Sequence, residues 1–160
     1  IKVDHFSVAP LYDSNRIIYR DKSYKRQAYT YHQWRVSPGD LVTYFLRRDM
    51  KQSGLFQAIL SQESNFPSVY LLEGTVDEFF ELDKENVWEA VLSVSIAFIN
   101  EAESDITKKI LFQKTYHATK PCQQKNPRSL AQAMSLAMSE ISSNRIHDVY
   151  ETLKNHRISN

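Results

Sequence analysis

The chain has 160 residues, the length of one domain of ordinary size. Its 20 Lys and Arg residues nearly balance 19 Asp and Glu residues. This argues against a dedicated nucleic-acid binder, which usually carries a basic excess or stripe. Hydrophobic residues make up 42% of the chain and charged residues 24%, as in a globular domain and unlike a disordered segment. We therefore expect residues 1–160 to form a single domain.

Glycine and cysteine usage excludes several kinds of site. The three glycines, Gly39, Gly54 and Gly74, are not spaced like the Gly-rich loops that cradle phosphates. Nucleotide binding through such a loop is therefore excluded, and we expect no cofactor. Cys122 is the only cysteine, which rules out an internal disulfide and a cysteine-based zinc site. The chain begins with Ile1 rather than Met, inside an apparent strand, so we expect a signal or anchor segment upstream.

Short strands are predicted in the N-terminal part. Residues 1–8 carry apolar side chains with a change of phase near His5, which indicates a bulge or bend. Residues 16–20 follow a turn-like Asp-Ser-Asn, and residues 27–34 are rich in Tyr and Thr, as is typical of strands. A further short strand is expected at residues 56–60.

A helix is predicted to begin at Pro38. Ser37 is a favourable N-cap, Pro38 suits the first helical position, and Asp40 lies near the positive end of the helix dipole. An apolar stripe then recurs at helical spacing, and Gly54 suits a C-terminal stop. The stripe consists of Leu41, Val42, Phe45, Leu46 and Met50.

Three successive segments alternate apolar and polar side chains with period two, at residues 70–82, 88–98 and 110–118. Such alternation predicts strands with one buried and one wetter face. The polar connections between them are short enough for an antiparallel meander.

The terminal segment predicts a second amphipathic helix, with Asn126 as its cap and Pro127 in its first turn. Its apolar stripe changes phase beyond residues 142–144, which indicates a kink or two halves that pack on different surfaces. The combined pattern predicts an α/β (α+β) fold. We expect a two-layer sandwich of a mainly antiparallel sheet with two amphipathic helices on one face.

The sequence offers no convincing catalytic or metal site. None of the five histidines belongs to an HExxH helix or a pair with metal-ligand spacing, and no Gly-x-Ser-x-Gly elbow occurs. The acidic residues Glu81 and Asp83 fall on a predicted wetter strand face and in a hairpin, where solvated charge explains them. Lys120 could lower the pKa of Cys122, although a simple free thiol is the more economical interpretation.

An aromatic cluster is the densest candidate surface. Its members are Tyr19, Tyr24, Tyr29, Tyr31 and Trp34. Tyr29 and Tyr31 share a strand face opposite that of Trp34, so one face can be core while the other is available to a partner. Sheet packing of the aromatic rings remains the alternative.

The order and spacing of several motifs resemble the ABC-type transport auxiliary lipoprotein family, including its PqiC-like members. The resemblance runs over nearly the whole chain. Its motifs are Arg-Ile-Ile-Tyr-Arg at 16–20, Tyr-His-Gln-Trp at 31–34, Ser-Pro at 37–38, Ser-Gly-Leu-Phe at 53–56, Tyr-Leu-Leu-Glu-Gly-Thr-Val at 70–76, Phe-Gln-Lys at 112–114 and an Ala/Met/Ser-rich helix at 131–139.

This resemblance implies a non-enzymatic lipoprotein in the periplasm of a Gram-negative bacterium. A lipid anchor upstream of Ile1 would hold it to the outer (or inner) membrane. The implied partners are an MCE-domain protein, an ABC transporter permease and ATPase, and phospholipid as cargo, with a homo-oligomeric ring as a further expectation.

Two alternatives stay open. The first is a monomeric lipid-binding carrier in which Met134 and Met138 line an apolar groove, since Met adapts to irregular ligands. Ordinary core packing of the two methionines is the simpler interpretation. A hydrolase with an unrecognised site is the second alternative, and no residue pattern points to it.

Overall fold

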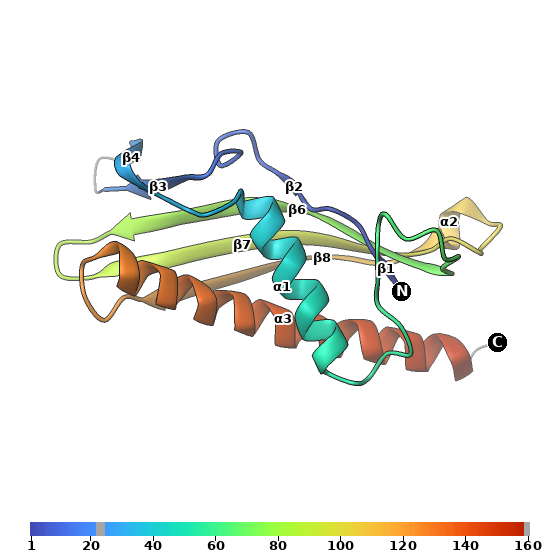
Figure 1. The fold of residues 1–160 in the computed structure, drawn as a ribbon. Coiled ribbons are helices and arrows are strands. Elements are labelled where there is room, and N and C mark those ends of the chain that lie inside the picture. Colours follow the sequence, from blue (N-terminus) through green and yellow to red (C-terminus); the bar gives the residue numbers. More distant parts are fainter. Residues whose placement is uncertain (22–24, 159–160) are drawn as a thin grey trace.

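The computed structural model describes residues 1–21 and 25–158. In this part of the chain an eight-stranded sheet forms one layer. Helices α1 (Pro38–Gln52) and α3 (Pro127–Ile158) form the other layer, on one face of the sheet (Figure 1). A single helical turn, α2 (Ile106–Lys109), lies in the connection between the last two strands. The two-layer α/β sandwich predicted from the sequence is confirmed.

The predicted meander forms one side of the sheet, and the N-terminal strands form the other. The meander consists of β6 (Tyr70–Asp83), β7 (Trp88–Asn100) and β8 (Ile110–Pro121), paired antiparallel. On the other side of β6, three short strands pair parallel to it one after another: β1 (Lys2–Val3), β2 (Ser7–Val8) and β3 (Arg16–Arg20). Outside these lie β5 (Leu60–Ser61), next to β1, and β4 (Arg26–Gln33), next to β3. The strand predicted at residues 56–60 is thus reduced to the pair at 60–61.

The break between β1 and β2 places Phe6 in the core, over Gly74 of β6. A Cβ atom at Gly74 would lie 2.3 Å from the Ser95 carbonyl oxygen and 2.5 Å from the Phe6 ring. Only glycine leaves room for this close packing. The phase change predicted near His5 therefore corresponds to a real bend that delivers Phe6 to the helix side of the sheet.

A β-bulge corrects the prediction for Glu81. The register of β6 against β7 shifts between Val76 and Glu78. Beyond the bulge, Phe79 opposes Leu92 and Glu81 opposes Ala90. The odd-numbered residues of β6 therefore turn from the open face to the helix face. Glu81, which the alternation placed on the wetter face, is completely buried.

Helix α3 runs unbroken from Pro127 to Ile158, through residues 142–144, where a kink or two differently packed halves were expected. The apparent change of phase arises because two polar residues, Ser142 and Arg145, occupy buried positions between the apolar Met138 and Val149. Spacings of three and four residues continue through them. Among the described residues, no helix, including this long one, is apolar enough over a sufficient length to cross a membrane.

Candidate functional site

Strand β4 carries the predicted partner surface. Within the described part of the chain it pairs with β3 alone and forms one border of the sheet. Tyr31 on this strand is 93% exposed, whereas Tyr29 is half-buried. The Tyr29 ring packs against Tyr19 at a centroid distance of 5.0 Å and against Trp88 at 6.4 Å. Of the pair singled out from the sequence, Tyr31 is therefore exposed to solvent and Tyr29 is largely committed to packing.

Trp34, a further member of the cluster, is committed to packing. Trp34 packs edge-on against Phe79, with ring centroids 5.2 Å apart, on the helix side of the sheet. Tyr24 lies outside the described residues. The structure thus brings Tyr19 and Tyr29 together, and it places Trp34 in a separate contact next to the start of α1.

The Tyr29 hydroxyl contacts Glu81, which the sequence analysis interpreted as a solvated charge and which is buried. The Tyr29 hydroxyl lies 3.1 Å from both carboxylate oxygens of Glu81 and donates to them. Burial raises the Glu81 pKa from 4.5 to about 7; the Tyr29 hydrogen bond opposes this rise, and the nearby charge of Asp83 adds to it. The pKa of the Tyr29 hydroxyl is raised by burial and by Glu81, so this hydroxyl stays protonated as the donor.

The other candidates from the sequence are in the core. Met134 and Met138 are buried in the layer between α3 and the sheet. Cys122 is also buried, and desolvation raises its pKa to about 11. A thiol with that pKa is protonated at neutral pH and is a poor nucleophile. The free thiol preferred from the sequence is confirmed, and the alternative that Lys120 lowers its pKa is wrong.

A second buried charge, Arg145, lies between α3 and α1. Its Nη2 donates to the Leu46 carbonyl oxygen at 3.3 Å, while Nε and Nη1 have no hydrogen-bond partner among the described residues. Burial lowers the Arg145 pKa from 12.5 to about 9. Hydrophobic periodicity could not predict that this arginine is buried. A charged residue within an apolar stripe is normally interpreted as the point where the buried stripe ends.

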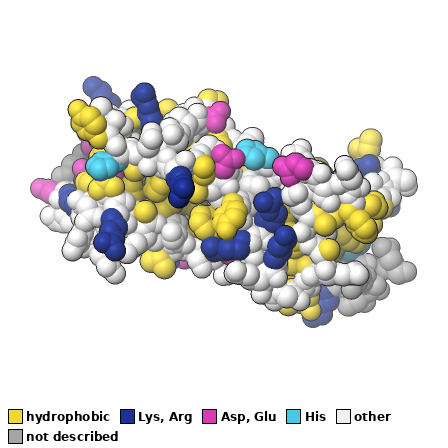
Figure 2. All heavy atoms as spheres, in the orientation of Figure 1, with side chains coloured by type: hydrophobic (Ala, Val, Ile, Leu, Met, Phe, Trp, Pro, Cys, Tyr) yellow, Lys and Arg dark blue, Asp and Glu magenta, His cyan; other side chains and the backbone are white. Residues whose placement is uncertain are grey.

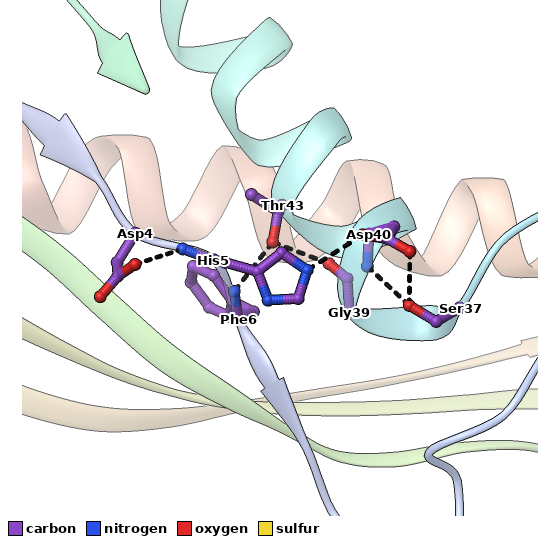
Figure 3. Close-up of polar contacts among 7 residues, drawn as sticks. All are labelled: Asp4, His5, Phe6, Ser37, Gly39, Asp40 and Thr43. Carbon is purple, nitrogen blue, oxygen red and sulfur yellow. Dashed lines mark hydrogen bonds and ion pairs between the residues drawn. The ribbon is translucent and has the colours of Figure 1, made fainter. Parts of the chain in front are cut away.

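A polar cluster fastens the N-terminal segment to the start of α1 (Figure 3). Asp40 receives a hydrogen bond from the Ser37 hydroxyl at 2.7 Å, and its other oxygen lies 3.0 Å from Nε2 of His5. The hydrogen bond from Ser37, with that from His5, lowers the Asp40 pKa. In the same cluster the Phe6 backbone N–H donates to the Thr43 hydroxyl at 2.9 Å.

This cluster has the residue types of a hydrolase triad but not its connections. A nucleophilic serine needs a histidine to accept its proton, with the carboxylate behind the histidine. Here the carboxylate of Asp40 stands between Ser37 and His5. The cluster therefore caps and fastens α1. In the described part of the chain, no group of three or more His, Cys, Asp or Glu side chains is placed to hold a metal ion.

An open groove of about 750 Å³ lies at the end of the molecule that holds the C-terminal part of α3. Figure 2 shows hydrophobic side chains gathered toward the right-hand end of this face. One wall is the segment from residue 55 to 70, and the other is α3. The groove is lined by Ile1, Leu55, Phe56, Gln57, Ala58, Leu60, Phe66, Pro67, Ser68, Val69, Tyr70, Tyr150, Leu153 and Lys154. Met134 and Met138 are not among them.

Comparison with known proteins identifies the family. A family model described as "ABC-type transport auxiliary lipoprotein component" matches residues 1–144. The chain belongs to this family. The resemblance seen in the sequence motifs is thereby confirmed, and the members of this lipoprotein family are auxiliary components of ABC-type transport. A search of curated proteins gave no match.

Solved structures share the fold of this auxiliary lipoprotein. The protein XCC0632 from Xanthomonas campestris is 18% identical, with a TM-score of 0.84 over 98% of this chain and 86% of its own. The hypothetical protein CT253 from Chlamydia trachomatis is 10% identical, with a TM-score of 0.56 over 93% of this chain and 95% of its own. At these identities the likeness concerns the fold alone.

Proposed function

We propose that this auxiliary lipoprotein is a non-enzymatic periplasmic component of an ABC/MCE-type lipid transport system. It docks or scaffolds the transporter and is held to the outer (or inner) membrane by a lipid anchor upstream of Ile1. The observation that carries the proposal is the family match over residues 1–144. The partners are an MCE-domain protein and the ABC permease and ATPase.

Strand β4 supports the docking part of this proposal. A strand with a free edge can pair with a strand of another chain, and backbone hydrogen bonds then supply affinity. Tyr31 projects from this strand with 93% of its side chain exposed. Tyrosine is enriched among the residues that dominate binding energy at protein interfaces. The same edge can serve contacts between copies of the chain, in keeping with a homo-oligomeric ring.

Affinity purification from cross-linked envelopes tests the proposal. The tagged full-length lipoprotein should retain the MCE-domain and ABC subunits, and Tyr31→Ala should reduce that retention at least ten-fold. Tyr44→Ala is the matched control, since Tyr44 is also exposed but lies on α1. Native mass spectrometry of the purified protein measures its oligomeric state and so tests for the ring. The proposal fails if no transporter subunit is retained and deletion of the gene leaves lipid transport and barrier function unchanged.

A further inference from the structure

The groove between residues 55–70 and α3 leaves large apolar side chains open to water. Phe66 is 69% exposed, Val69 49% and Leu55 47%, and all three line the same hollow. Single exposed apolar residues are ordinary, whereas a contiguous group of them around a hollow marks a binding site. The volume of about 750 Å³ falls within the range of roughly 300–1,000 Å³ typical of small-molecule sites.

The side-chain charge that lines the groove is positive. Lys154 is the only charged side chain among the described residues that line it, and no carboxylate does so. Among the described residues the ammonium of Lys154 pairs with Glu151, at the long distance of 3.9 Å, and both side chains are well exposed. An exposed pair of this kind contributes little free energy. Lys154 can therefore turn toward an anionic group at the mouth of the groove.

We propose that this groove binds an anionic amphiphile with a single hydrocarbon chain. The chain lies against Phe66, Val69 and Leu153, and the anionic head remains at the open side beside Lys154. A long amphipathic side chain such as lysine keeps its charge in water while its stem covers apolar surface, which suits it to the boundary between chain and head. The site does not depend on docking through Tyr31, which lies on β4, outside the residues that line the groove.

A hydrocarbon chain accounts for the groove better than a protein partner does. The exposed apolar side chains line a hollow that is open to solvent, and a hollow of this size matches a small ligand. Protein partners bury a broad surface of about 800 Å² on each side. A second copy of this chain is accordingly an outcome that the experiment must be able to detect.

Isothermal titration of the purified protein with decanoate, dodecanoate and tetradecanoate tests the proposal, each below its micelle concentration. Because transfer of a methylene from water is favourable by about 0.8 kcal/mol, each added methylene should tighten binding roughly two- to four-fold until the groove is filled. Dodecanoate should bind more tightly than the neutral dodecyl maltoside. The cationic dodecyltrimethylammonium should bind most weakly.

Three variants locate the site. Phe66→Glu should weaken dodecanoate binding at least ten-fold, and Lys154→Glu should abolish the preference for the anionic head. Leu136→Glu should leave binding unchanged, because Leu136 is a 60% exposed residue of α3 that does not line the groove. The proposal is overturned if no amphiphile binds, if the cation binds as tightly as the anion, or if Phe66→Glu has no effect. It is also overturned if Phe66→Glu dissociates an oligomer of this chain, because the groove is then an interface between copies.

Discussion

Replacing Glu81 with Gln should stabilise the protein at high pH and leave it nearly unchanged at low pH. The folded-state pKa of Glu81 is about 7, against 4.5 for the free side chain. The folded protein therefore holds the proton more tightly than the unfolded chain does, and the contribution of this group is most favourable below pH 4.5. It declines as the pH rises from 4.5 to 7, by about 3 kcal/mol in total, and is constant above that range. Gln is uncharged and its side-chain oxygen still accepts the Tyr29 hydroxyl, so the variant lacks this decline.

Urea unfolding at a series of pH values from 4.5 to 8, followed by circular dichroism, measures the difference between variant and parent. The variant should be more stable by up to about 3 kcal/mol at pH 8 and within about 1 kcal/mol of the parent at pH 4.5. Glu73→Gln is the matched control, because Glu73 is exposed on the same strand and should show no such trend. A difference that does not change with pH, or a variant less stable at pH 8, would refute the assignment of a buried, uncompensated charge. Since we propose a single domain, each curve should show one transition.

Three further substitutions test the packing. Gly74→Ala should destabilise the protein by about 1–3 kcal/mol or more, because the added Cβ would overlap the Ser95 carbonyl and the Phe6 ring. A lower urea midpoint than that of the parent would confirm this. Ser37→Ala should remove the cap of α1 and lower the free energy of unfolding by about 1 kcal/mol. A parent-like midpoint would contradict the capping role. Arg145→Met should be neutral or stabilise the protein by about 1–4 kcal/mol, since two of the three guanidinium nitrogens are buried without a hydrogen-bond partner among the described residues. A loss of several kcal/mol would show that the charge is compensated.

The elements of this fold could be predicted wherever local chemistry determines them. The cap at Ser37 with Pro38 set the start of α1, and residues 16–20 form β3 as expected. The three long strands followed from their period of two. The parallel pairing of β1, β2 and β3 along β6 could not be predicted, because it joins residues far apart in sequence, and periodicity carries no information about such partners.

The errors share a physical cause, namely that polarity was used as a measure of exposure. Glu81 and Arg145 are both completely buried, although their residue types predict solvent contact. A one-residue bulge in β6 redirected Glu81, and two buried polar residues within the stripe of α3 produced its apparent change of phase. The groove was equally invisible, because its walls come from two segments that meet only in the folded chain.

The roles of Tyr29 and Tyr31 differ although they lie only two residues apart on β4. The hydroxyl of Tyr29 donates to a buried carboxylate, so removing it would take a hydrogen bond away from that carboxylate and destabilise the strand itself. Loss of docking in a Tyr29→Phe variant would therefore be ambiguous between a lost contact and a disturbed strand. Tyr31 has 93% of its surface in water, and its truncation removes little folded-state packing. A docking defect specific to Tyr31→Ala, at unchanged stability, would then be attributable to a contact with the partner.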